Sequence, residues 1–192
     1  FDLYCPFYER GLEWLKEDNG RLGYITPNQF MVTDYGENTR KIIFEETAIL
    51  EICDFRDSGV FEDATNYPAV VIVEDEPNEA ERDAATIRCT RVRADAEEKD
   101  KRELDEAVID SIREHNDDPG YSDNLVDVFD YPQSQLGTDY WALMPPREQE
   151  IFDKLERKGD KRMEEVTDAI FPGPTTGSNK IYVVEVVDAH QI

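Results

Sequence analysis

The chain has 192 residues and is 39% hydrophobic, which suffices for one domain with a real core, or for one domain and part of another. Its 45 acidic and 21 basic residues give a formal net charge of −24, and the acids are spread along the chain, which favours a salt-adapted, hydrated surface over a disordered acidic tail. No apolar run is long enough to cross a membrane and no cysteine–histidine cluster has zinc spacing, so the sequence predicts neither a membrane span nor a metal site.

The three cysteines and the first residue bear on the origin of the chain. Cys5, Cys53 and Cys89 are far apart and lie in apolar segments, which predicts reduced core thiols in a cytoplasmic protein. The chain starts at Phe1, without an initiator methionine and inside a predicted helix. We therefore expect a fragment of a larger polypeptide.

The first half of the chain alternates helices and strands. Apolar residues at steps of three and four predict a helix over 3–17, on one face of which fall Leu3, Phe7, Gly11, Leu12 and Leu15. Asn19-Gly20 ends this helix. The following elements are predicted to be a strand at 21–26, a helix at 35–46 capped by Asp34, and strands at 48–55 and 67–74. This order predicts an α/β fold, of which three strands and two helices make only a thin sheet.

The second half is more charged and less regular. A polar break at 74–83 suggests a boundary to a different part. The later predicted elements are a strand at 86–94, a charged helix at 97–115, a short strand at 141–146 leading into a helix, a helix at 161–169 and a strand at 181–188.

Three spaced segments carry a resemblance to a known family: DLYCPFYERGLEWLKEDNGRLGYITPNQF, then YGENTRKIIFEE, then ILEICDFRDSGVFEDATNYPAVVIVE. In this order they resemble the second half of the catalytic domain of TaqI-like N6-adenine DNA methyltransferases. That family occurs alone and as the methylase part of fused type II restriction–modification enzymes. A weaker resemblance, to the start of the target-recognition region, continues through Tyr140-Trp141-Ala142-Leu143 to TTGSNK.

The resemblance implies a fold, a reaction and a division of the chain. We expect a partial Rossmann-like methyltransferase sheet followed by an α+β segment. The expected parts are the end of the catalytic domain (1–80), a connecting segment (81–139) and the start of the recognition region (140–192). The implied reaction moves a methyl group from S-adenosylmethionine to the exocyclic amine of an adenine flipped out of double-stranded DNA. The family's Asn-Pro-Pro-Tyr motif and glycine-rich cofactor segment are absent, so the fragment itself is expected to be inactive.

Two segments are expected to line the base pocket. Ligands in open α/β sheets gather at the carboxyl ends of strands, where Thr26, Pro27 and Asn28 lie. The proline stiffens this turn, and we expect a structural role for Asn28. The resemblance places the start of the first helix beside the same pocket, with the candidates Asp2, Leu3, Tyr4 and Phe7. The alternative for this helix is that its aromatic residues only fill the core.

Tyr67 is the candidate for stacking on the flipped adenine, and Phe61 is the second choice. The resemblance implies an aromatic ring in this segment, and stacking one base on a ring is worth roughly 1–3 kcal/mol. The alternative is that Tyr67 is an ordinary aromatic residue at the edge of a strand.

Because the chain is so acidic, DNA binding requires local basic clusters. The densest cluster surrounds residues 154–162, and the TTGSNK loop adds further candidates. The predicted DNA-binding residues are Lys154, Arg157, Lys158, Lys161, Arg162, Thr176, Asn179 and Lys180. A third group, Arg88, Arg91 and Arg93, lies on one predicted strand, with Arg91 and Arg93 on the same face. In each case the alternative is a merely solvated charged face.

These observations predict a fragment of a site-specific DNA adenine-N6 methyltransferase. The alternative is a noncatalytic DNA-binding or assembly module. The strand at 21–26 should be central in a full sheet, so we also expect the isolated piece to self-associate through an unpaired edge or to be marginally stable.

Overall fold

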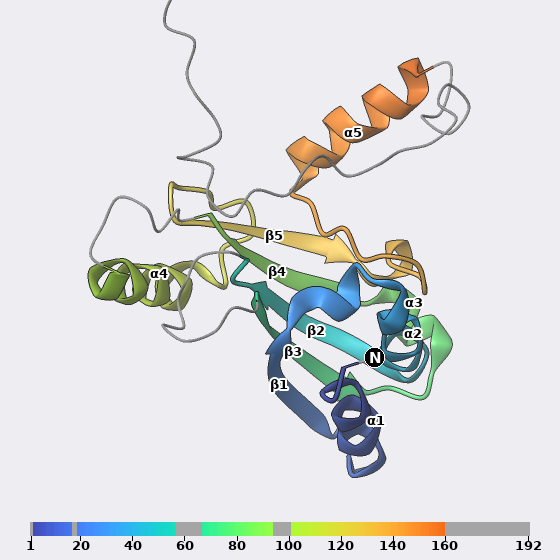
Figure 1. Cartoon of the computed structure of the whole chain (residues 1–192). Coiled ribbons are helices and arrows are strands. Elements are labelled where there is room, and N and C mark those ends of the chain that lie inside the picture. Colours follow the sequence, from blue (N-terminus) through green and yellow to red (C-terminus); the bar gives the residue numbers. More distant parts are fainter. Residues whose placement is uncertain (1, 17–18, 57–66, 94–100, 160–192) are drawn as a thin grey trace, which may run out of the picture. The chain divides into compact units, whose positions relative to one another are not determined.

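The computed structural model describes residues 2–16, 19–56, 67–93 and 101–159, with the backbone alone for 101–105. The chain divides into a unit of residues 1–150 and a unit of residues 151–192. The elements of the first unit are shown in Figure 1.

Within the described residues, five strands form one mixed sheet with the order β1-β3-β2-β4-β5. The strands are β1 (Arg21–Pro27), β2 (Thr47–Asp54), β3 (Pro68–Asp75), β4 (Thr86–Val92) and β5 (Val126–Pro132). β3 lies between β1 and β2 and is antiparallel to both, β4 is parallel to β2, and β5 is antiparallel to β4. The predicted α/β class is confirmed, and the three strands of the first half do share one sheet.

Helices pack on both faces of the sheet. On one face α1 (Cys5–Glu13) and α2 (Glu37–Glu46) enclose a core that includes Tyr8, Phe30, Ile43, Val71 and Trp141. On the other face α4 (Lys101–His115) covers a smaller cluster that includes Cys53, Val108 and Val128. Neighbouring residues of β3, Val70 and Val71, belong to opposite clusters because side chains alternate along a strand.

The buried stripe of α1 differs from the predicted one. Tyr4, Tyr8 and Gly11 are buried, whereas Leu3 and Phe7 are exposed. Tyr4 and Tyr8 can be buried because their hydroxyls form hydrogen bonds in the core. Tyr8 Oη lies 2.9 Å from Thr26 Oγ1, and Phe30 N donates to Tyr4 Oη at 3.0 Å. The alternative that Phe7 only fills the core is therefore wrong.

Three local predictions in the remainder of the first unit are also corrected. Asp34 does not cap α2; a 3-10 turn, η2 (Asp34–Gly36), comes first, and Asp34 accepts a hydrogen bond from Tyr140 instead. The polar break contains a short helix, α3 (Glu79–Ala84), which Asn78 caps by accepting from Ala80 N. Residues 141–145 form no strand, because Trp141 N donates to Met31 O, outside the sheet, and Pro145 and Pro146 have no amide hydrogen.

β5 lies in a segment for which the sequence predicted no strand. Its acidic residues break the alternating pattern, yet Asp127 is buried. Arg91 makes this possible, since its Nη2 lies 2.8 Å from Asp127 Oδ2. β4 and β5 continue the sheet of the first half, while the boundaries after residues 80 and 139 stay predictions.

The last described helix, α5 (Pro146–Lys158), spans the division between the two units. Its residues from 151 to 158 are all exposed. None of the described helices is long and apolar enough to cross a lipid bilayer. The predicted helix at 161–169 and strand at 181–188 lie outside the described residues.

Candidate functional site

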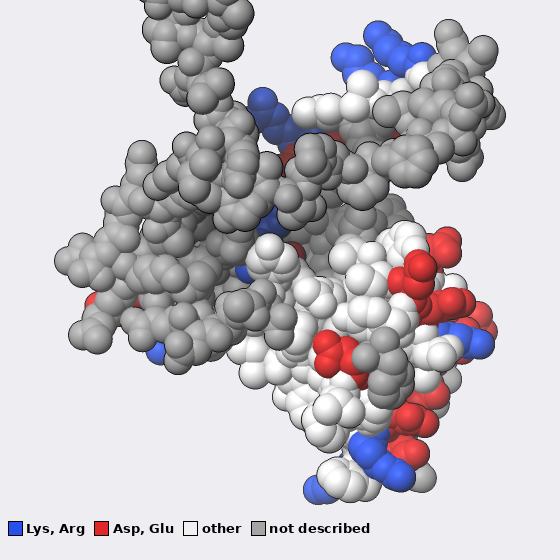
Figure 2. All heavy atoms as spheres, viewed as in Figure 1, with Lys and Arg blue, Asp and Glu red and all other residues white. Residues whose placement is uncertain are grey.

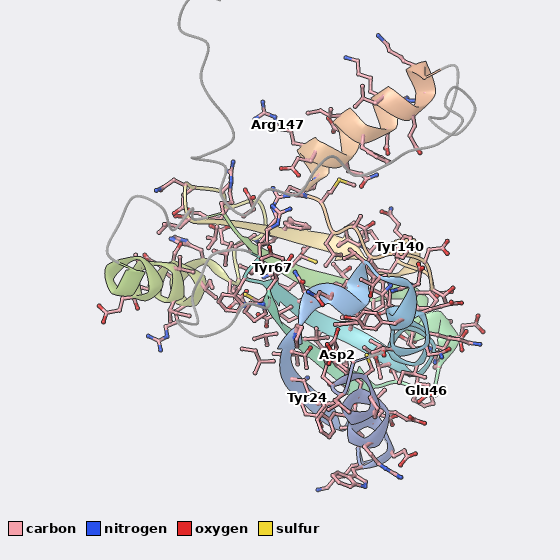
Figure 3. All side chains as sticks on the ribbon, viewed as in Figure 1. Asp2, Tyr24, Glu46, Tyr67, Tyr140 and Arg147 are labelled. Atoms are coloured by element: carbon pink, nitrogen blue, oxygen red, sulfur yellow. The ribbon has the colours of Figure 1, made fainter. Side chains whose placement is uncertain are left out.

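The predicted pocket-lining turn and the candidate stacking residue meet at one end of the sheet. Because β1 and β3 are antiparallel, Pro27 at the end of β1 pairs with Pro68 at the start of β3. β2 also ends here, and its Asp54 pairs with Ala69. In Figure 3, Tyr67 lies at this end of the strands, away from Glu46, which precedes β2. We call this place, formed by residues 26–28, 54–56 and 67–68, the β1–β3 end.

Asn28 ties the three segments of the β1–β3 end together. Its backbone N donates to Tyr67 O at 2.7 Å, and its side-chain Nδ2 donates to Asp54 Oδ1 at 2.8 Å. The same carboxylate oxygen accepts from Arg56 N at 3.0 Å. Phe55 N donates to Pro68 O at 3.0 Å. The side-chain partner of Asn28 is thus a carboxylate of another strand and not the local backbone, while its place in a pocket wall stays a prediction.

The ring of Tyr67 is accessible. The residue is 43% exposed, while its backbone carbonyl is held by Asn28. An exposed aromatic residue on a fixed backbone can stack on a planar ligand at little entropic cost. Phe61, the second choice, lies outside the described residues. The role of Tyr67 in base stacking stays a prediction.

The predicted wall at the start of the first helix is only partly connected to the β1–β3 end. Tyr4 is buried and its hydroxyl accepts from Phe30 N, in the 3-10 turn η1 (Asn28–Met31) that follows β1. Burial, and then the hydrogen bond with Tyr35, raises the pKa of Tyr4, so this hydroxyl stays neutral. Asp2 accepts from Leu3 N at 2.7 Å, and Phe7 is 60% exposed. Pocket lining by these residues stays a prediction.

Only part of the predicted DNA-binding set is described. Lys154, Arg157 and Lys158 are exposed on α5, with Arg157 Nε donating to Asp153 O at 3.2 Å. Lys161, Arg162, Thr176, Asn179 and Lys180 lie outside the described residues. In Figure 2, acidic side chains gather over the side of the first unit that carries α2 and α3, and uncharged side chains cover the region beside them.

The arginines of β4 are bound by carboxylates. Arg91 Nη2 lies 2.8 Å from Asp127 Oδ2 and 2.5 Å from Glu148 Oε1. Arg93 Nη1 lies 3.2 Å from Asp127 Oδ1. Because both arginines reach Asp127, they share a face of the sheet, as predicted. The hydrogen bond from Arg91 lowers the pKa of Glu148. Arg88 pairs with Asp130 at 2.7 Å. These three arginines are therefore held by internal ion pairs and are poor candidates for phosphate contacts.

Sequence reasoning overlooked two residues of this region. Asp54 stands at the end of a predicted strand, where a carboxylate directly before a turn is a usable signal. Arg40 is buried and holds the main chain of residues 30–33. No periodic pattern singles it out, because it sits on a helix face where a solvated arginine is equally common.

Known proteins match the first part of the chain, which includes residues 26–28 and 54–56 of the β1–β3 end. Residues 1–61 match the family of Eco57I restriction-modification methylases. The resemblance drawn from the sequence is thereby confirmed. The chain is 36% identical over 74 residues to type II methyltransferase M.XhoI of Xanthomonas vasicola. This alignment covers 38% of this chain and 13% of the relative. It is also 36% identical over 76 residues to type II restriction enzyme and methyltransferase RM.Eco57I of Escherichia coli, covering 40% of this chain and 8% of the relative.

A more distant relative extends the similarity along the chain. Type II methyltransferase M.PaeR7I of Pseudomonas aeruginosa is 24% identical over 183 residues, which are 95% of this chain and 29% of the relative. The chain thus spans less than a third of the length of each of these three relatives.

Proposed function

We propose that this chain is a segment of a type II restriction–modification enzyme that methylates adenine at N6 in double-stranded DNA. The methylase match over residues 1–61 carries the reaction class. The choice of adenine rests on the motifs that resemble the TaqI-like family. The enzyme is proposed to act in the cytoplasm, since Cys5, Cys53 and Cys89 are buried free thiols.

The observation that carries the proposal for the site is the bonding of Asn28 to both Asp54 and Tyr67 at the β1–β3 end. The bond to Tyr67 holds the backbone carbonyl of that residue, and the residue itself is exposed. Extrusion of a base costs a few kcal/mol. Stacking on this ring would return roughly 1–3 kcal/mol of that cost.

S-adenosylmethionine would supply the methyl group. The glycines of the described residues are isolated and form no glycine-rich turn that could cradle this cofactor. The described residues therefore do not fit the main binding site of S-adenosylmethionine. In this proposal the β1–β3 end orients the acceptor base, and the segment alone does not transfer methyl groups.

The test is methyl transfer by the full-length enzyme that contains this chain, with Tyr67→Ala and Tyr67→Phe compared. Loss of about 1–3 kcal/mol of stacking should lower kcat/KM of Tyr67→Ala roughly 5- to 150-fold, while Tyr67→Phe keeps most of the activity. Labelled methyl incorporation into adenine-containing duplexes is the measurement.

Trp14→Ala is the matched control, because Trp14 is also an exposed aromatic residue but lies at the end of α1. If kcat/KM of Tyr67→Ala stays within twofold of the wild-type value, Tyr67 does not stack on the base. A wild-type enzyme that labels cytosine and not adenine would contradict the proposed base.

A further inference from the structure

One buried arginine on α2 holds the turn that carries Asn28. Arg40 is 2% exposed, and its Nη1 donates to Phe30 O at 2.5 Å and to Thr33 O at 2.8 Å. Its Nε donates to Thr138 O at 3.2 Å, which joins the turn to a segment about a hundred residues later in the chain. Among the residues described, the ion pairs do not include Arg40.

The later segment contacts the same turn independently of Arg40. Trp141 N donates to Met31 O at 2.8 Å, and the Trp141 ring meets the Phe30 ring edge-on at 5.9 Å. Tyr140 donates to Asp34 and lies under the Arg40 guanidinium, whose Cζ is 5.2 Å from the ring centroid. Residues 138–141 therefore form a strap over residues 30–34, with Arg40 between the two; Figure 3 labels Tyr140 in it.

A buried guanidinium is costly unless its donors are satisfied, and here carbonyl oxygens satisfy them. The planar fork of arginine can bond two segments in fixed directions, whereas the single ammonium of lysine cannot. The carbonyls of Phe30 and Thr33 lie in and just after η1, which begins at Asn28. Any shift of this turn moves Asn28 relative to Asp54 and Tyr67.

We propose that Arg40, together with the strap 138–141, is a positioning residue for the base pocket. It fixes η1, and through Asn28 it holds the ring of Tyr67 where the extruded base is stacked. This role rests on the proposed function, and it connects the pocket wall to the first residues of the predicted recognition region, which begins at residue 140.

The decisive variant is Arg40→Lys, which keeps the charge and removes the fork. In the full-length enzyme we expect kcat to fall about 10- to 100-fold, since misplacement of a reacting group by about 1 Å has effects of this size, while KM for S-adenosylmethionine stays within about twofold. Hydrogen exchange of the Phe30 and Trp141 amides should become at least about tenfold faster, because both amides bond within this assembly.

Arg82→Lys is the matched control, because Arg82 on α3 also donates to a main-chain carbonyl, that of Glu76, away from this turn. Tyr140→Ala is a second variant that should fold, since Tyr140 is exposed. It removes the ring and the bond to Asp34, and its kcat should fall in the same direction.

The outcomes separate the two levels of the proposal. An active wild type in which Arg40→Lys melts earlier but keeps its kcat and its exchange rates makes Arg40 a purely structural residue and overturns this inference alone. A wild type with no methyl transfer to adenine overturns the proposed function and the role of Arg40 with it.

Discussion

Asp54 is the residue on which the geometry of the β1–β3 end depends most. Its Oδ1 accepts from both Asn28 Nδ2 and Arg56 N, and Arg56 itself has the positive φ of 48°. One carboxylate thus fixes the turn after β1 and the turn after β2. A hydrogen bond to a charged group is worth more than a neutral one, and leaving its donors unsatisfied adds to the loss.

We expect Asp54→Ala to lower the free energy of unfolding by about 1–3 kcal/mol. Asp54→Asn, which keeps one acceptor oxygen, should lose less. Urea denaturation measures both values. The control is Asp110→Ala, since the Asp110–Arg113 pair is exposed and should change stability by less than about 0.5 kcal/mol. Equal values for Asp54→Ala and Asp110→Ala would contradict the role given to Asp54.

Between η1 and α2, the main chain at Gly36 lies very close to the main chain at Phe30. Gly36 lies directly before α2, and a Cβ placed on it would be 2.0 Å from Phe30 O. Its φ is −80°, so an unusual backbone angle is not the reason for glycine here. The reason is the approach of two main-chain segments, which also brings Phe30 O to Arg40.

Gly36→Ala should therefore destabilise the protein by about 1–3 kcal/mol through overpacking. Gly23→Ala is the matched control on β1, where the nearest atom to a new Cβ, Ile72 Cγ1, is 3.9 Å away. It should be neutral or slightly stabilising, because alanine reduces the freedom of the unfolded chain. Thermal melts of the two variants side by side provide the measurement. Equal melting temperatures for Gly36→Ala and Gly23→Ala would contradict the close contact at Gly36.

At the scale of the whole molecule, β1 is an edge strand of the described sheet and pairs with β3 alone. Ile25 on this strand is 54% exposed. An apolar edge strand is a template for pairing with another chain, and a charge of −24 opposes association only until salt screens it. Self-association of the isolated segment stays a prediction on these grounds.

We expect light scattering in high salt to show dimers or larger species of the isolated segment. Ile25→Lys should shift the population toward monomer, because a charge at an edge opposes strand pairing. Val32→Lys is the control, since Val32 is equally exposed, at 55%, but lies after η1 and not on the edge strand. A monomeric wild type with a sharp melting transition would refute the prediction.

The order and type of the elements up to residue 75 can be read from the amino-acid sequence, because hydrophobic periodicity and turn residues are local signals. Motifs spaced along the first third of the chain also predicted the resemblance that the match of residues 1–61 to Eco57I restriction-modification methylases supports. The sequence placed Asn28 and Tyr67 as candidates, but it did not show that they touch.

Which elements are neighbours depends on the three-dimensional fold. β3 inserts between β1 and β2, so Asn28, Asp54 and Tyr67 meet. They do so although Asn28 follows β1, Asp54 ends β2 and Tyr67 precedes β3. β5 is a strand because Arg91 neutralises the buried Asp127, and Arg40 is buried because two distant segments offer it carbonyls. Such pairings depend on the register between strands and on partners far along the chain, and no local pattern encodes either of them.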